Sequence, residues 1–128
     1  MGAGGLGKAF LGYEGFKSNG LNVVAAFDLD ERIIGKQVAG KQILHLDELE
    51  RFVKERKIRI GIIAVPKRAA QEILDKMVGA GIKAVWNFAP AALTAPKDVI
   101  VKTEDLAASL AILAGKLYRL DLDEKEKV

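Results

Sequence analysis

The sequence predicts an α/β fold in which helices cover both faces of a parallel sheet, followed by an apolar C-terminal helix. Short apolar runs rich in β-branched residues alternate with amphipathic stretches along most of the chain, which is typical of parallel strands joined by helical crossovers. Gly2, Gly4 and Gly7 have the G-x-G-x-x-G spacing of a dinucleotide-binding turn. We therefore expect a Rossmann-like nucleotide-binding domain over residues 1–103, a dimerisation helix over 104–120 and a charged tail over 121–128.

The composition limits the chemistry that the chain can perform. Among its 128 residues are no cysteine and a single histidine, His45, which excludes a disulfide framework, thiolate metal ligands and a thiol nucleophile. We expect His45 to be a boundary or packing residue, and we expect no metal site and no enzymatic activity. The net charge of +3 is dispersed along the chain and does not favour nucleic-acid binding by this segment. No apolar run approaches the roughly 20 residues of a membrane span, so we expect a cytoplasmic protein.

The glycine-rich start determines how the rest of the chain is interpreted. In a dinucleotide-binding turn, glycines allow the tight reversal and the close approach of backbone N–H groups to a pyrophosphate, which rests on the N-terminus of the next helix. That helix is expected over residues 8–17, where Gly12 and Gly15 each cost about 1 kcal/mol relative to alanine and therefore require a close neighbour. A buried strand should precede the turn, yet only Met1 precedes Gly2. We therefore expect that the first strand is missing and that the sequence is a fragment or an internal start.

A second phosphate-binding pattern overlaps the first. Residues 2–8 also match G-x-x-x-x-G-K, the start of the phosphate loop of nucleotide hydrolases. That motif continues with a Ser or Thr hydroxyl that binds magnesium, whereas this chain has Ala9. The pattern therefore favours the dinucleotide-binding turn.

The next apolar run ends in an acidic residue. Residues 21–27 are almost continuously apolar and predict a strand covered on both faces, with Asp28 at its carboxyl end. An acidic residue about 20 positions after the last glycine is placed to bind the adenosine ribose. The alternative is a solvent-exposed loop aspartate, with Asp30 and Glu31 equally available as ligands.

The remaining pattern continues the alternation of strands and helices. Strands are expected over 42–45, 58–65, 83–86 and 99–101, and helices over 47–56 and 67–78. Ala64, Val65 and Pro66 follow one strand, and Asn87 and Phe88 follow another. Open α/β sheets bind ligands at the carboxyl ends of their strands, so both loops are candidate binding segments. The alternative is that they only terminate their strands.

The final helix is apolar nearly all round. Leu106, Leu110, Leu113 and Leu117 form one seam, and alanines continue the apolar surface to either side. A helix of this kind is expected to be buried. We expect it to lie between two protomers, with coverage inside a single domain as the alternative.

Several stretches resemble one known family. Residues 2–9, Gly-Tyr-Glu-Gly-Phe at 12–16, Ala-Val-Pro at 64–66 and Asn-Phe-Ala-Pro at 87–90 are similar to the cofactor-binding domain of the redox-sensing transcriptional repressor Rex. The resemblance extends to about Leu113. It implies a homodimeric bacterial regulator that senses the NADH to NAD⁺ ratio, with NADH releasing the repressor from operator DNA.

The resemblance also implies roles for individual residues. Tyr13 would lie near the nicotinamide and pair with Asp105 at the start of the partner's C-terminal helix, which the family exchanges between protomers. The implied cofactor-binding residues are Gly2, Gly4, Gly5, Leu6, Gly7, Tyr13, Asp28, Ala64, Val65, Pro66, Asn87 and Phe88. The implied dimer residues are Asp105, Leu106, Leu110, Leu113 and Leu117.

The sequence departs from the family pattern at a few points. Gly5 replaces a usual Asn, and Leu106 replaces an aromatic residue that some members place beside the nicotinamide. The winged-helix DNA-binding domain and the first strand are absent from the sequence, so we do not expect the chain to bind operator DNA by itself. Two alternatives remain, a CoA-binding domain of the acyl-CoA ligase type and a fragment of an NAD-dependent dehydrogenase, although the latter lacks an evident catalytic acid.

Overall fold

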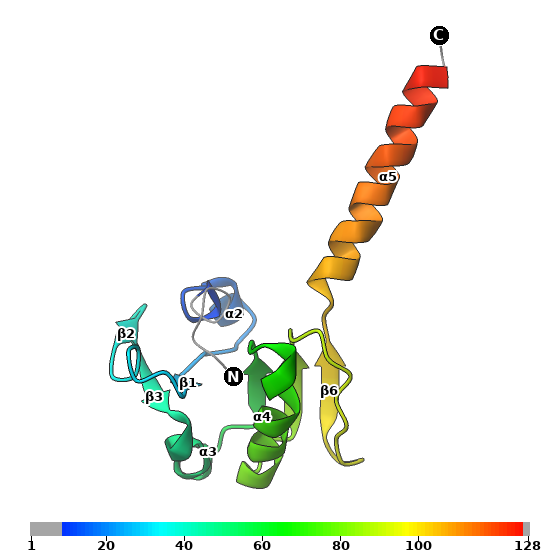
Figure 1. The fold of residues 1–128 in the computed structure, drawn as a ribbon. Coiled ribbons are helices and arrows are strands. Elements are labelled where there is room, and N and C mark those ends of the chain that lie inside the picture. The colour runs from blue at the N-terminus through cyan, green and yellow to red at the C-terminus, as the bar shows by residue number, and fades with distance from the viewer. Residues whose placement is uncertain (1–8, 127–128) are drawn as a thin grey trace.

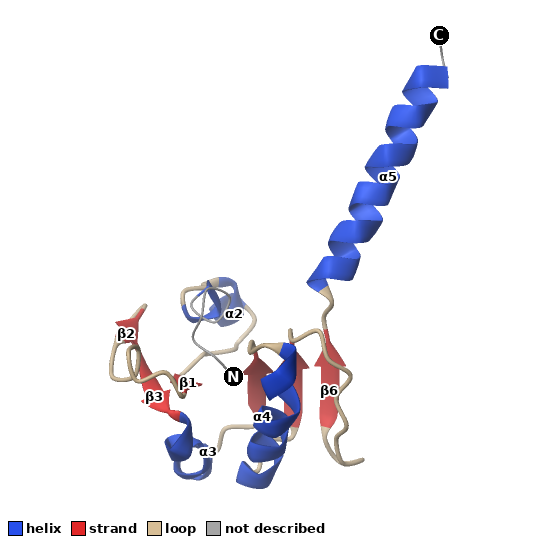
Figure 2. Ribbon diagram, viewed as in Figure 1, coloured by secondary structure: helices blue, strands red, loops and turns tan. Residues whose placement is uncertain are grey.

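The computed structural model describes residues 9–126, whose strands form two three-stranded sheets (Figure 1). The first sheet has the order β1-β3-β2, with bounds Ala26–Asp28 for β1, Gln37–Val38 for β2 and Lys41–His45 for β3. The second has the order β4-β5-β6, with bounds Ile60–Ile63, Ala84–Asn87 and Ile100–Thr103. All neighbours are parallel except β2 and β3. The predicted α/β class with parallel strands and helical crossovers is confirmed (Figure 2).

Helix α4 (Lys67–Ala80) packs against the second sheet. Its buried residues are apolar and recur at helical spacing: Ala70, Ile73, Leu74, Met77 and Ala80. Gly61 in β4 lies beneath this helix, and a Cβ atom at that position would lie 2.8 Å from Sδ of Met77. The absence of a side chain at Gly61 therefore lets Met77 pack directly on the strand.

Helix α3 (Leu49–Arg56) connects the two sheets through the core. It follows a short 3-10 turn, Leu46–Glu48, at whose start His45 Nδ1 accepts a hydrogen bond from the N–H of Asp47 at 3.0 Å. His45 is thus a boundary residue, as expected. Leu49 and Val53 on α3 share one buried cluster with Phe27 of β1 and with the α4 side chains, so a single main core lies under both sheets.

The prediction of one continuous helix over residues 8–17 is wrong. Residues 9–11 are helical, the chain then turns, and helix α2 covers only Gly15–Ser18. The Tyr13 ring lies over Gly15, where any Cβ atom would overlap with it. The close neighbour that Gly15 requires is therefore Tyr13 of the same chain.

The strand expected over residues 21–27 is also shorter than predicted. Only Ala26–Asp28 pairs, in register with Ile43, Leu44 and His45 of β3. Residues 21–25 have the composition of a strand but are not assigned to one. A strand is defined by its hydrogen-bonded neighbour, and among the described residues this stretch has none.

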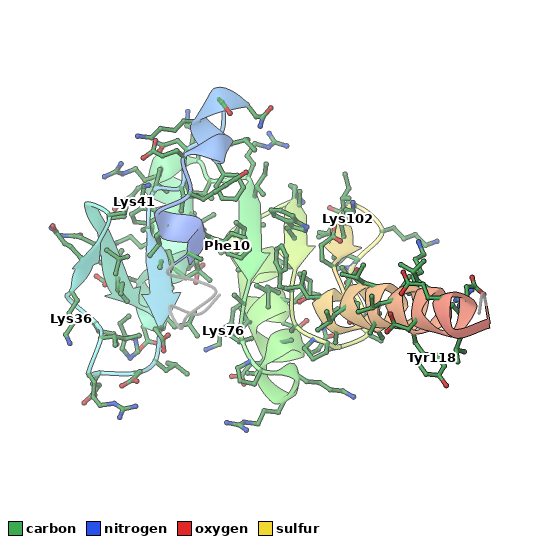
Figure 3. All side chains as sticks on the ribbon, turned by 90° about the horizontal axis from the view of Figure 1, so that it is seen from above. Phe10, Lys36, Lys41, Lys76, Lys102 and Tyr118 are labelled. Carbon is green, nitrogen blue, oxygen red and sulfur yellow. The ribbon has the colours of Figure 1, made fainter. Side chains whose placement is uncertain are left out.

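Helix α5 (Leu106–Glu126) extends away from the rest of the chain (Figure 1). Its expected end at Leu120 is too early, because the helix continues into the charged segment that was expected to be a tail. The predicted seam residues Leu106, Leu110, Leu113 and Leu117 are 56 to 66% exposed, and Tyr118 projects from the side of α5 (Figure 3). Among residues 9–126, no helix combines the length and apolarity needed to cross a membrane.

Candidate functional site

The predicted phosphate-binding turn cannot be placed. Gly2, Gly4, Gly5, Leu6 and Gly7 lie outside the described residues. The candidate site is therefore built from the described segments alone, which are the end of β1, the ends of β4 and β5, and the segment from residue 9 to α2.

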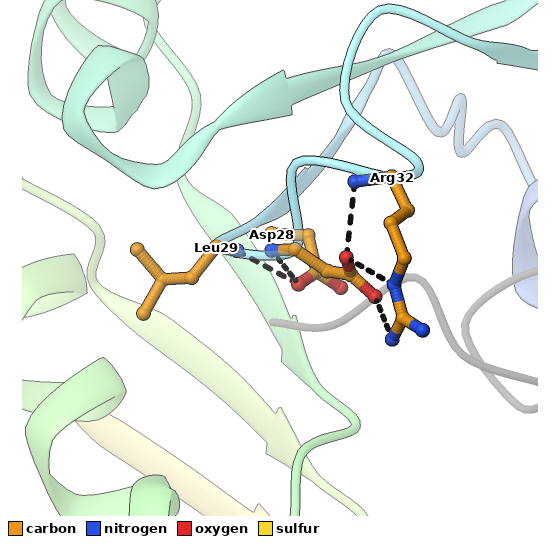
Figure 4. A network of polar contacts seen from close by, with 4 residues as sticks. Asp28, Leu29 and Arg32 are labelled. Carbon is orange, nitrogen blue, oxygen red and sulfur yellow. Dashed lines mark hydrogen bonds and ion pairs between the residues drawn. The ribbon is translucent and has the colours of Figure 1, made fainter.

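Asp28 ends strand β1 and is half-buried. Its Oδ1 accepts hydrogen bonds from the backbone N–H groups of Leu29, at 2.7 Å, and Asp30, at 2.9 Å (Figure 4). These two donors fix the orientation of the carboxylate at the carboxyl end of the strand. This is the place that sequence reasoning assigned to the ribose ligand.

Asp30 is the alternative ribose ligand that the sequence offers, and its carboxylate forms an ion pair with Arg32. Arg32 Nε donates to its Oδ1 at 3.0 Å and Arg32 Nη2 to its Oδ2 at 2.9 Å (Figure 4). This bidentate pair, with the backbone N–H of Arg32, lowers the pKa of Asp30 below its ordinary value. Asp30 is thus held by Arg32 within the loop that follows β1, and the ribose role of Asp28 stays a prediction.

The carboxyl ends of β4 and β5 lie side by side. Ile63 is paired with Asn87, and the N–H of Phe88 donates to the carbonyl of Ile63 at 2.9 Å. The segments that follow, residues 64–66 and 88–90, therefore lie at the same end of the second sheet, where its strands have their carboxyl ends. Sequence reasoning expected the two candidate binding loops at this edge, and the structure brings them together.

Asn87 has a different environment from the one expected of a ligand-binding amide. It is completely buried, and its Oδ1 accepts from the N–H of Ala89 at 2.9 Å. Its Nδ2 donates to the carbonyl of Ala89 at 3.1 Å and to Oγ1 of Thr103 on β6 at 3.3 Å. Asn87 therefore orients the Phe88 loop from within, and a direct contact with cofactor stays a prediction.

Four aromatic rings gather beside these loops. Phe88 lies 4.5 Å from Trp86 and 4.8 Å from Phe10, and Phe16 lies 6.3 Å from Trp86, all measured between ring centroids. Tyr13 adds an edge-to-face contact with Phe16 at 4.9 Å. The sequence predicts a site role for Tyr13 and Phe88, and for Trp86 and Phe88 together it predicts that only one of the two faces the binding cleft. The two rings instead contact each other, because positions two apart on a strand share one face. Phe10 and Phe16 are given no site role from the sequence.

The aromatic cluster is linked to the start of α5. Nε1 of Trp86 donates to Oε1 of Glu104 at 3.3 Å, and Lys102 forms an ion pair with the same oxygen at 3.1 Å. These contacts, with Lys102 first, lower the pKa of the Glu104 carboxyl. Asp105 accepts from the N–H of Ala108 at 2.9 Å and thereby caps the helix. Its expected pairing with Tyr13 would join two protomers and stays a prediction.

Comparison with known proteins agrees with this geometry. The family model described as a CoA binding domain matches residues 1–91, and the chain belongs to that family. Among its relatives, the chain is 50% identical over 125 residues to the redox-sensing transcriptional repressor Rex of Desulforamulus reducens, covering 98% of this chain and 58% of that protein. It is 50% identical over 113 residues to Rex of Treponema denticola, covering 88% and 54%. The resemblance to Rex repressors is confirmed.

Solved structures give the same result. The crystal structure of RSP, a Rex-family repressor, superposes with a TM-score of 0.88 at 38% identity, covering 99% of this chain and 61% of RSP. RSP in complex with β-NADH superposes with a TM-score of 0.88, and RSP with β-NAD⁺ and operator DNA with 0.87. The chain thus spans a little over half the length of the relatives it matches. These relatives are named as repressors rather than enzymes.

Proposed function

We propose that this chain is the NAD(H)-binding, redox-sensing domain of a Rex-type transcriptional repressor. The observation that carries the proposal is Asp28, a half-buried carboxylate fixed by two backbone N–H groups at the carboxyl end of β1. A carboxylate at this point suits the ribose hydroxyls of an adenine dinucleotide. The solved complexes of RSP with β-NADH and with β-NAD⁺ and operator DNA support the same ligand class.

The other predicted site residues also fit such a dinucleotide. The glycine spacing at positions 2, 4 and 7 suits the pyrophosphate. Ala64, Val65 and Pro66, which carry no charge, and the aromatic Phe88 and Tyr13 suit the flat nicotinamide ring. When bound, the nicotinamide supplies the redox difference that is sensed. The chain itself binds and orients it, in a homodimer of cytoplasmic chains, and performs no catalysis.

Sensing requires that the two redox forms stabilise different arrangements of the protomers, because a ligand shifts an equilibrium only by its differential affinity. The hydrogen bond from Trp86 to Glu104 connects the aromatic cluster with the base of α5, and the exposed apolar seam of α5 suits a second protomer. Release of operator DNA would then follow in a winged-helix domain that these 128 residues do not include.

Titration calorimetry of the purified chain with NADH, NAD⁺, NADPH and CoA tests the proposal. We expect NADH to bind at least about tenfold more tightly than NADPH, because Asp28 repels a 2′-phosphate, and more tightly than CoA. CoA is the necessary competitor because the matching family is described as a CoA binding domain. Tighter binding of CoA than of NADH, or no binding of NADH, would contradict the proposal.

A further inference from the structure

The connection between β5 and β6 is unusual for two parallel strands. Such strands are ordinarily joined by a crossover that contains a helix, whereas residues 88–99 form neither helix nor strand (Figure 2). This crossover runs from the carboxyl end of β5 to the amino end of β6, and it begins with the candidate binding loop at Phe88. Long loops without secondary structure are uncommon in compact domains, so other contacts must hold the crossover in place.

A side chain of α4 holds the middle of this crossover. Oε1 of Gln71 accepts a hydrogen bond from the N–H of Thr94 at 2.9 Å, and Nε2 of Gln71 donates to the carbonyl of Thr94 at 3.0 Å. The same Nε2 donates to Oδ1 of Asp75, about one turn later on the helix, at 2.9 Å. Because a carboxylate accepts hydrogen bonds, Asp75 fixes which end of the Gln71 amide carries the nitrogen. This Gln71–Thr94 clamp therefore has one defined orientation.

The first part of the crossover is held at its other end by Asn87. The side chain of Asn87 is hydrogen-bonded to both the N–H and the carbonyl of Ala89. The N–H of Ala91 donates to that same carbonyl at 2.8 Å. The segment that carries Phe88 is therefore fixed from within the sheet at Ala89 and from α4 at Thr94.

Helix α4 also begins at the other candidate binding loop. Its first residue, Lys67, follows Pro66 directly, and Gln71 lies about one turn further along. Gln71 therefore ties the crossover to the first turns of the helix that continues the loop at 64–66. The position of one loop relative to the other depends on this clamp as well as on the pairing of β4 with β5.

We propose that Gln71 is a positioning residue for the nicotinamide, because it holds the crossover against α4 and thereby sets the gap between the loops at 64–66 and 88–90. This role rests on the proposed function, which assigns the nicotinamide to these loops. A ligand binds less tightly in proportion to the time that its site spends outside the competent arrangement. Loss of the clamp should therefore weaken the contribution of the nicotinamide to binding and leave that of the adenosine, at Asp28, unaltered.

Calorimetric titration with two ligands separates this role from a general loss of stability. ADP-ribose has the adenosine and pyrophosphate of NADH but lacks the nicotinamide. Gln71→Met keeps the length of the side chain and removes its hydrogen bonds. It should weaken NADH binding at least about fivefold and change ADP-ribose binding by less than about twofold. Gln42→Met, which replaces an exposed glutamine on β3, is the matched control and should change neither affinity.

Hydrogen exchange of the ligand-free chain gives a second readout. In Gln71→Met, the amides of Thr94 and Ala89 should both exchange at least about fivefold faster than in the unsubstituted chain, because the segment between them is released at one end. Gln42→Met should leave both rates unchanged. Since Gln71 is only half-buried, the variant should fold, which circular dichroism checks.

Three outcomes would show that Gln71 does not position the nicotinamide. These are equal losses of NADH and ADP-ribose affinity in Gln71→Met, an unaltered NADH affinity, or faster exchange at Thr94 without any change at Ala89. Binding of neither ligand by the unsubstituted chain would overturn the proposed function and the role of Gln71 with it. An unaltered NADH affinity in Gln71→Met would overturn the role of Gln71 alone.

Discussion

At the scale of single residues, Asp28 and Asp30 show how neighbouring carboxylates acquire different roles. Arg32 holds Asp30 in a bidentate pair, whereas backbone N–H groups orient Asp28. Asp28→Ala should therefore weaken NADH binding about tenfold, or about 1.4 kcal/mol, and reduce the discrimination against NADPH. Calorimetry measures both affinities. Glu31→Ala, which changes an exposed acid in the same loop, is the matched control, and an equal loss in both variants would remove Asp28 from the ribose role.

Asn87 supports a second prediction at this scale. Asn87→Ala removes the Oδ1 that accepts from the N–H of the buried Ala89, and the Nδ2 that donates to the Ala89 carbonyl and to Thr103. Leaving the buried Ala89 N–H without a partner should lower the free energy of unfolding by about 2–3 kcal/mol, measured by urea denaturation. The exposed Asn22 provides the control, since Asn22→Ala should change stability by less than about 0.5 kcal/mol. A stability loss below 1 kcal/mol for Asn87→Ala would show that the loop does not depend on this amide.

The site could be predicted from the sequence only in part. Asp28 and the loops at residues 64–66 and 88–90 follow from a simple rule, because parallel strands end at one edge of the sheet. Glu104 could not be found in this way, since its contact with Trp86 joins strand β5 to the segment after β6. The buried role of Asn87 was also inaccessible, because an amide in a sequence gives no sign of whether its partners are internal.

At the scale of elements, α5 carries the exposed apolar surface that the proposed homodimer would cover. Leu113 is 64% exposed in the middle of the apolar seam, and Leu29, in a loop after β1, is 59% exposed. Leu113→Lys should weaken dimerisation at least about tenfold because it places a charge in an apolar interface. Leu29→Lys should leave dimerisation unchanged. Light scattering after size exclusion over a range of concentrations measures both, and a Leu113→Lys dimer of unaltered affinity would exclude α5 as the interface.

The element boundaries show which signals a sequence lacks. Helix α4 and its buried residues follow directly from a helical apolar period. The stretch at 21–25 has equally suitable side chains, yet its conformation depends on a neighbouring strand rather than on its own residues. The break between residues 11 and 15 depends on Tyr13 folding back over Gly15, a local contact that periodicity does not reveal.

At the scale of the whole molecule, the alternation of strands and helices predicts parallel sheets but not their separation into two. Strand β5 lies between β4 and β6 and packs against α4. Strand β1 has three residues and one paired neighbour among the described strands. The main cluster includes Phe27 of β1, with Leu44 of β3 packed against it, whereas Leu11, Ala26 and Ile43 form a small separate cluster. The second sheet should therefore be the more stable part.

Hydrogen exchange of the ligand-free chain tests this division. Amides of β5 should exchange at the rate of global unfolding, because opening β5 disrupts the packing of α4 and both neighbouring strands. Amides of β1 and β3 should exchange at least about tenfold faster through partial opening of the first sheet. If β1 and β5 exchanged equally slowly, the two sheets would unfold as one unit.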